Sequence, residues 1–362
     1  MGKLLLFILL IAAAAAGWLW YSINYPYQGF SPEGVFVEVP HGSSSRSVAR
    51  LLERIGVVRS SIAFEIYARR HPRRSLQAGE YFFDRATSAH DVFWKLANGQ
   101  VFEQPFTVRE GETIFDIARD LEAGKFMPAS EFLRAAKDPA LIQDIAPKAA
   151  TLEGFLFPAT YHLSRHPSAT ALTADMVRKF KEEWNAVTSL GSTRDVMTIS
   201  GAAQQTPEDF VGAEKPTAST RPVAAVVTLA SLIERETPRA EERPVVAGVF
   251  ENRLHKNMLL QCDPTVIYAL EQQGRYNGTL STADLHIDSP YNSYTHTGLP
   301  PGPIGNPGAA SLRAAYLPAH TDYLYFVANT QGGHFFSATL AEHNNNVIKY
   351  RRLLAGEQAS TR

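Results

Sequence analysis

The chain has 362 residues, 45% of them hydrophobic and 20% charged, a composition typical of a folded protein with room for two or three compact modules. Its net charge of −1 gives no concentrated basic face, so we expect no nucleic-acid partner. The single cysteine, Cys262, excludes an internal disulfide and a cysteine-based zinc site. No spacing of acidic or histidine residues around His334 and His343 supports a metal-ligand set, so we predict neither a metal nor another cofactor.

The N-terminus carries an apolar run, LLLFILLIAAAAAGWLW from Leu4 to Trp20, which is just long enough to cross a bilayer core as a helix. Lys3 is the only charge before the run, and this bias leaves the N-terminus in the cytoplasm and sends the rest outward. We therefore predict that residues 1–23 form a single-pass anchor in the inner membrane, with the body of the protein in the periplasm. The alternative is a cleaved signal peptide, because Ala12 to Ala16 offer a cleavage site.

A linker rich in turn formers, residues 24–34, is predicted to precede a repeated pattern. VEVPHGSSSRSVARLLE from Val37 aligns without a gap with FTVREGETIFDIARDLE from Phe106. Each copy predicts a short strand, a Gly turn, and a helix capped by Ser or Thr. We predict a first strand–helix unit over 35–105 and a second over 106–150. The second resembles the LysM motif, which binds glycans containing N-acetylglucosamine, although a unit that only packs and spaces is an equal alternative.

Residues 190–221 are polar, rich in small residues and without period, and they predict an exposed, disordered insertion after a helix over 169–189. Beyond the insertion, up to about Tyr350, the chain is dense in aromatic residues, Asn, Pro and Gly. Many turns and polar side chains in a folded context favour a functional site over a spacer. We place one domain over 151–355 and a short tail over 356–362.

The segment PVAAVVTLASLIERET, from Pro222 to Thr237, predicts a buried helix because it is apolar nearly all round. Glu234 and Glu236 close this helix. Apolar surroundings and the partial negative charge of a helix C-terminus both raise a carboxyl pKa, and a protonated carboxylic acid suits general-acid cleavage of a glycosidic bond. The alternative is that both glutamates pair with nearby arginines at an exposed helix end.

Six stretches in order carry a family resemblance: LEGFLFPATY, LASLIERET, GVFENRLHKNMLLQCDPTVIYAL, YNGTLSTADL, SPYNSYTHTGLPPGPIGNPGAASLRAAYLPA and YLYFVANTQGGHFFSATLAEHN. With the membrane segment, they resemble the YceG-like (MltG) family of endolytic murein transglycosylases over nearly the whole chain. The insertion at 190–221 departs from the family pattern, as does Cys262, where a small polar residue such as Thr is expected.

The resemblance implies a lyase that cuts the bond between N-acetylmuramic acid and N-acetylglucosamine and leaves 1,6-anhydro ends. It places the catalytic acid at Glu236, since the acid in such enzymes ends a helix and precedes Ser or Thr; Glu234 is the runner-up. It implies peptidoglycan glycan strands as substrate, and action on new strands beside penicillin-binding synthases. Substrate-binding candidates, each with a structural role as the alternative, are Asn252, Gln261, Asp263, Thr265, Tyr268, Tyr291, Asn292 and Tyr294.

We expect an α+β fold with an N-terminal transmembrane helix, LysM-like strand–helix units, and a mostly helical, lysozyme-like catalytic domain over 151–355 with a small sheet. Two other functions stay open. A hydrolase of the same bond needs a second carboxylate to activate water, and Asp263 or Asp288 could supply it. A non-catalytic wall-binding scaffold would use the N-terminal repeats and would not need Glu236.

Overall fold

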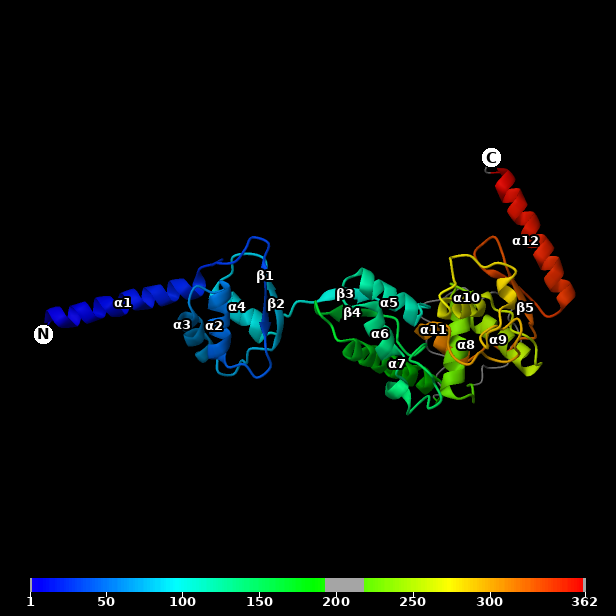
Figure 1. Cartoon of the computed structure of the whole chain (residues 1–362), viewed down its shortest axis with the longest axis horizontal. Helices are drawn as coiled ribbons and strands as arrows, with labels where there is room; N and C mark the ends of the chain where they lie inside the picture. The colour runs from blue at the N-terminus through cyan, green and yellow to red at the C-terminus, as the bar shows by residue number, and fades with distance from the viewer. Residues whose placement is uncertain (1, 193–217, 361–362) are drawn as a thin grey trace. The chain divides into compact units, whose positions relative to one another are not determined.

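A computed structural model describes residues 2–192 and 218–360, which fold into helices and small two-stranded sheets (Figure 1). The chain divides into two compact units, one of residues 1–104 and 162–165, the other of 105–161 and 166–362. The second unit takes in 106–150 and all of 151–355 except residues 162–165, whereas these two segments were predicted as separate domains. Most of the predicted insertion, residues 193–217, lies outside the described residues, and α7 runs up to Ser192 before it.

The first unit begins with a 23-residue helix, α1, which is long and apolar enough to cross a membrane. At 1.5 Å per residue it is about 35 Å long. Its last turn packs into the unit, since Ser22 and Ile23 are buried. The predicted linker follows and is mostly exposed, with backbone contacts to the unit that include the Gly29 N–H donating to Gly56 O at 2.8 Å. The elements are α1 (Gly2–Asn24), β1 (Val35–Val39), α2 (Ser45–Ile55), α3 (Ser61–Arg69), β2 (Gly79–Phe83) and α4 (Ala89–Ala97).

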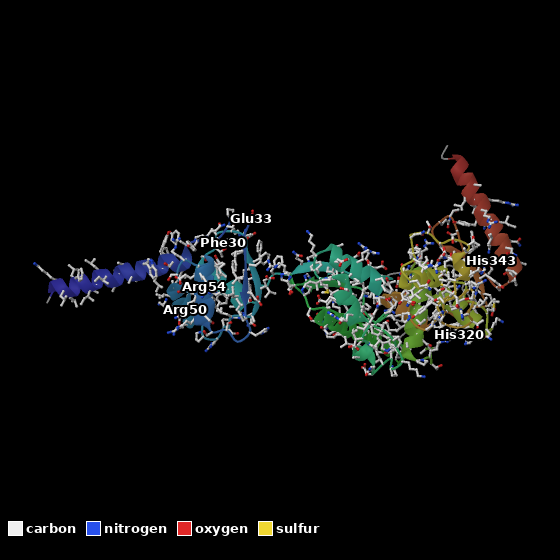
Figure 2. All side chains as sticks on the ribbon, viewed as in Figure 1. Phe30, Glu33, Arg50, Arg54, His320 and His343 are labelled. Atoms are coloured by element: carbon white, nitrogen blue, oxygen red, sulfur yellow. The ribbon has the colours of Figure 1, made fainter. Side chains whose placement is uncertain are left out.

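The core of the first unit lies between the two-stranded β1–β2 sheet and three short helices. β1 pairs antiparallel with β2, from Val35 opposite Phe83 to Val39 opposite Gly79. α2 is amphipathic: one face is buried, and the other presents Arg50 and Arg54 to solvent (Figure 2). The buried side chains of this core include Val37, Val39, Ala49, Leu52, Phe64, Tyr81 and Phe93.

The predicted repeat is present as a strand, a glycine turn and a capped helix in both copies. Gly42 and Gly111 adopt left-handed backbone angles, with φ of 75° and 81°, which glycine reaches without strain. Ser44 and Thr113 each cap the following helix by accepting a backbone N–H. Local sequence therefore specifies the same unit twice.

The second unit has α8 at the centre of its C-terminal helices. α8 packs against α9, α10 and α11 (Figure 1). α12 lies against the β5–β6 hairpin, and there the ring of His343, labelled in Figure 2, stacks on the ring of Tyr325 with centroids 5.3 Å apart. β3 pairs with β4, and β5 with β6. The elements are β3 (Gln104–Thr107), α5 (Ile114–Ala123), α6 (Ala129–Ala136), η1 (Pro139–Ile142), β4 (Thr160–Leu163), α7 (Ala169–Ser192), α8 (Val223–Glu236), α9 (Arg243–His255), α10 (Asp263–Gln272), η2 (Asp284–His286), α11 (Ala309–Tyr316), β5 (Tyr325–Ala328), β6 (His334–Ser337) and α12 (Leu340–Ser360).

Candidate active site

The central helix of the second unit, α8, carries both candidate acids at its C-terminal end. Residues 226–233 are buried without interruption, as the sequence pattern predicts for a helix that is apolar all round. Thr237 leaves the helix with extended backbone angles just before Pro238, which cannot continue it. Glu236 is therefore the last residue of the helix, and the buried helix fixes the position of its backbone.

Glu236 is a partly buried carboxyl group, and within the described residues it has no ion-pair partner within 4.0 Å. Burial raises the pKa of Glu236, and the nearby Asp263 charge raises it further. The Cys262 thiol, His334 and Arg253 act on this pKa in the opposite direction. A carboxyl with a raised pKa and no ion pair keeps its proton to a higher pH than a free carboxyl does, which favours the role of general acid.

Glu234 has different surroundings, because each of its two carboxylate oxygens has a hydrogen-bonding partner. Its Oε1 lies 2.6 Å from Arg243 Nη2, and its Oε2 accepts the Gly308 N–H at 2.9 Å. The side chains of Glu234 and Arg243 are only 4% and 7% exposed. Arg243 also lies 3.5 Å from Glu110 in the second strand–helix unit. These contacts give Glu234 a structural part in holding the loop around Gly308, and the geometry favours Glu236 as the acid.

Two predicted substrate residues meet beside Glu236. Tyr294 O–H donates to the carboxylate of Asp263, the first residue of α10. Both groups interact electrostatically with the Glu236 carboxyl, and burial raises the pKa of Tyr294, so its hydroxyl stays protonated. The structure thus brings Glu236, Asp263 and Tyr294 together from three segments of the chain.

Three other predicted residues turn their polar atoms toward the protein backbone. Asn252 donates through Nδ2 to carbonyls of the loop 321–323, at 2.6 and 2.9 Å. Thr265 is fully buried and donates to Cys262 O at 2.7 Å. Asn292, also fully buried, donates to two carbonyls of the preceding loop. These contacts are the structural alternative that the sequence left open, because they shape the loops around the site.

The remaining predicted residues are divided between surface and core. Gln261 is exposed, with a left-handed φ of 51°, and its N–H donates to Ser293 O. Tyr268 is buried and its hydroxyl donates to Glu153 at 3.1 Å. Tyr291 packs on Tyr268 with ring centroids 5.0 Å apart. Of these three residues, Gln261 is exposed, Tyr291 is partly buried and Tyr268 is buried.

Glu153 is a buried carboxyl that the sequence did not single out. It is 2% exposed and accepts the Ile114 N–H at the start of α5, with burial raising its pKa to about 8. Asn306, fully buried, donates to Glu153 at 3.2 Å and accepts the N–H groups of Gly154 and Leu156. This network joins the second strand–helix unit to the helices around α8, which explains why the two segments form one compact unit.

The other groups around Glu236 were not predicted as site residues: Cys262 was noted only as a departure from the family pattern, and His334 only in arguing against a metal site. Arg253 is 8% exposed and donates to Leu324 O at 2.7 Å and Leu260 O at 2.8 Å. Cys262 and His334 complete the surroundings. They come from segments far apart in the sequence, and no spacing rule links them. The only signal was their presence inside the stretches that carry the family resemblance.

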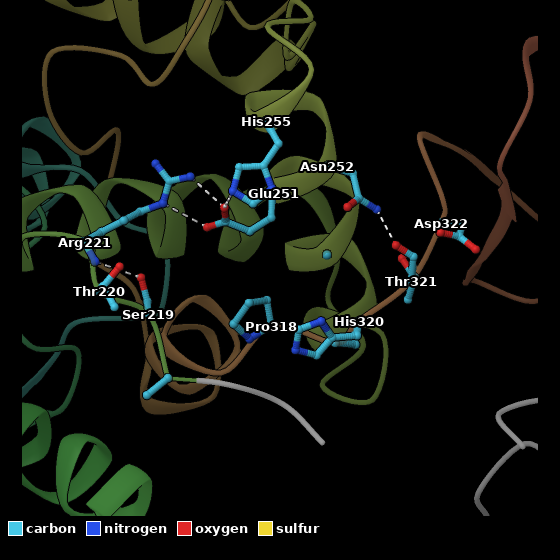
Figure 3. A pocket seen from close by; sticks show the side chains of 13 residues that line it. Ser219, Thr220, Arg221, Glu251, Asn252, His255, Pro318, His320, Thr321 and Asp322 are labelled. Carbon is cyan, nitrogen blue, oxygen red and sulfur yellow. Dashed lines mark hydrogen bonds and ion pairs between the residues drawn. The ribbon is translucent and has the colours of Figure 1, made fainter. Parts of the chain in front are cut away.

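A cavity of about 630 Å³ lies apart from this acid (Figure 3). Its described lining includes Ser219 to Arg221, which precede α8, and Asn252, but not Glu236 or Asp263. Because the 14 residues of α8 span about 21 Å, the segment before α8 lies far from Glu236. We therefore place the candidate catalytic centre around Glu236 and not in this cavity, since an acid must touch the bond that it protonates.

Comparisons with known proteins show which family the chain belongs to. Residues 37–349 match the model of the YceG-like family. An endolytic murein transglycosylase of Bacillus subtilis is 31% identical over 91% of this chain and 88% of its own length. One of Streptococcus pneumoniae is 28% identical over 96% of this chain, which spans 64% of that longer protein.

A solved structure gives the same answer for the fold. The crystal structure of a YceG-like protein of Listeria monocytogenes is 31% identical, covers 87% of this chain and 99% of its own, and superposes with a TM-score of 0.52. The family match covers well over half of the chain, and the Bacillus relative is similar along most of both sequences. The chain belongs to the YceG-like family.

Proposed function

We propose that this protein is an endolytic murein transglycosylase, a lyase that cuts peptidoglycan glycan strands, and that Glu236 is its catalytic acid. Relatives at 28–31% identity over most of the chain are named for this activity. The observation that supports the assignment of the acid is the contrast between two neighbouring carboxyls. Burial raises the pKa of both carboxyls, but Glu234 is bound in a buried ion pair, whereas Glu236 has no such partner among the described residues.

The reaction needs one carboxyl group in two roles. Glu236 first gives its proton to the glycosidic oxygen while positive charge develops at the anomeric carbon of N-acetylmuramic acid. The resulting carboxylate then takes the proton of that sugar's C6 hydroxyl, whose oxygen closes a 1,6-anhydro ring. The nucleophile is tethered to the reacting carbon, so little entropy is lost in recruiting it. The Arg253 and His334 charges stabilise the carboxylate between the two steps.

Asp263 and Tyr294 are proposed to line the sugar site beside Glu236. Asp263 raises the pKa of Glu236, which keeps the acid protonated, and it accepts the Tyr294 hydroxyl. The same carboxylate is the candidate base of the hydrolase alternative, in which it would activate water. Its hydrogen bond to Tyr294 favours a positioning role.

Location and partners follow from the N-terminal helix and the repeats. We propose that α1 anchors the protein in the inner membrane with both units in the periplasm, because its apolar side chains are exposed and Lys3 precedes them. The strand–helix units are proposed to be LysM-like and to guide glycan strands toward a lysozyme-like catalytic region. Action beside penicillin-binding synthases would then end the growth of new strands.

Matched substitutions of the two carboxylates beside the bond test this assignment. Glu236→Gln keeps size and polarity but removes the acid proton, so glycan cleavage should fall by roughly 10²–10⁴-fold. Asp263→Asn should cost much less, since the transglycosylase needs no second base. A Glu236→Gln variant with wild-type activity would refute the assignment. Loss of all cleavage in Asp263→Asn with normal folding would favour the hydrolase.

A further inference from the structure

His334, the first residue of β6, is held in place by one carboxylate. Its ring Nδ1 lies 2.7 Å from Glu242 Oε2, and its backbone N–H donates to Glu242 Oε1 at 2.9 Å. A carboxylate accepts but does not donate, so Nδ1 carries the hydrogen in this contact. The two contacts fix the position of the ring and leave Nε2 as its other polar atom.

The opposite nitrogen of this ring is free to meet a ligand. Within residues 2–192 and 218–360, Nε2 of His334 has no hydrogen-bonding partner, and it is not buried from solvent. The side chain as a whole is 11% exposed and packs edge-on against Phe326, with centroids 5.3 Å apart. A nearly buried, oriented imidazole with one open nitrogen is the arrangement by which proteins present histidine to a substrate.

The same carboxylate connects the ring to the end of α8. Thr237, which directly follows Glu236, hydrogen-bonds to Glu242 Oε2 at 3.2 Å. The His334 charge acts on the Glu236 carboxyl, so the two side chains belong to one electrostatic environment.

Other charged groups surround these two side chains. Those acting on Glu236 are Asp263 and Arg253, with the Cys262 thiol. On the Glu242 side, Arg239 lies 4.0 Å from the carboxylate. None of these groups forms a hydrogen bond with His334 Nε2.

We propose that His334 is a further substrate-contacting residue of the Glu236 site, that its Nε2 hydrogen-bonds a hydroxyl or N-acetyl group of the glycan, and that Glu242 is the residue that positions it. The inference rests on the proposed function and adds a binding contact to it. In the described residues no other role is visible for Nε2, whereas Nδ1 and the backbone N–H already serve the fold. The contact would hold the glycan strand against the acid.

Two substitutions of His334 test the roles of its two ring nitrogen atoms separately. In His334→Asn the amide can reach the Nδ1 position and donate to Glu242, but no atom reaches the Nε2 position. In His334→Gln the amide reaches the Nε2 position instead. The full-length protein in detergent, in a Glu236→Gln background that cannot turn over, is titrated with a peptide-free tetrasaccharide of alternating N-acetylglucosamine and N-acetylmuramic acid. Melting temperature, and KM and kcat with Glu236 intact, are measured in parallel.

We expect His334→Asn to weaken tetrasaccharide binding and raise KM by roughly 10-fold or more, the effect of one hydrogen bond to a ligand, with an unchanged melting temperature. His334→Gln should recover part of the affinity. Unchanged affinity and KM in His334→Asn overturn the inference, as does a loss that merely follows a fall in melting temperature. Failure of the proposed function is seen separately, as the absence of anhydro ends from the wild type, and the inference falls with it.

Discussion

Substitution by Gln should have different effects at the two neighbouring glutamates at the end of α8: at Glu234 it should lower stability, and at Glu236 it should lower activity but not stability. Glu234→Gln removes one charge from a buried pair in which both side chains are less than a tenth exposed. Breaking such a pair costs about 3–5 kcal/mol, because the partner charge stays buried without compensation. Gln still offers an oxygen to the Gly308 N–H, so we expect the lower end, about 3 kcal/mol. Glu236→Gln removes a group without an ion pair and should leave the free energy of unfolding nearly unchanged.

The magnitude is large enough to measure by differential scanning calorimetry. A loss of 1 kcal/mol lowers the melting temperature of a unit of this size by about 2–4 °C, so Glu234→Gln should lower it by about 6–12 °C. Glu110→Gln is the matched control, since Glu110 approaches the same arginine at 3.5 Å but is half exposed. Surface pairs contribute at most about 1 kcal/mol. A Glu234→Gln variant that melts within about 2 °C of the wild type and is inactive would refute this division of roles and move the acid to Glu234.

Three further predictions concern the rest of the chain. The Glu153 pKa is raised to about 8, so the folded state keeps a proton that the unfolded state loses. The free energy of unfolding should therefore fall between about pH 4.5 and 8, by about 1.4 kcal/mol per unit, and Glu153→Gln should remove that slope; a parallel slope in the variant would contradict it. Gly154→Ala should lower the melting temperature, because at φ 84° its added carbon would lie 2.5 Å from Pro303; an unchanged value would contradict the packing. Removal of residues 1–24 should move the protein from the membrane to the soluble fraction, and continued membrane binding would show a second anchor.

Elements set by local sequence could be predicted well. The glycine turns at Gly42 and Gly111 and the caps at Ser44 and Thr113 depend on residues within one turn of chain, so the repeat shows them directly. The burial of α8 likewise follows from its own apolar residues.

The site itself depends on contacts that local sequence does not encode. Three arginines lie near Glu234 in the sequence, and only folding shows that Arg243, beyond the Pro238 turn, forms the ion pair. Asn252 and Asn292 are substrate candidates by residue type, and in the structure their amides donate to backbone carbonyls, of the 321–323 loop and of the 285–287 segment respectively. An amide serves a sugar and a backbone carbonyl equally well, so residue type alone cannot separate the two uses.

The fate of water in the reaction tests the central claim most directly. Glycan strands are cleaved by the wild-type protein in water enriched in oxygen-18, and the new muramic-acid ends are weighed by mass spectrometry. If Glu236 uses the C6 hydroxyl as nucleophile, the ends are 1,6-anhydro sugars, lighter than reducing ends by one water and free of the heavy isotope. Reducing ends that carry oxygen-18 would contradict the account and establish a hydrolase.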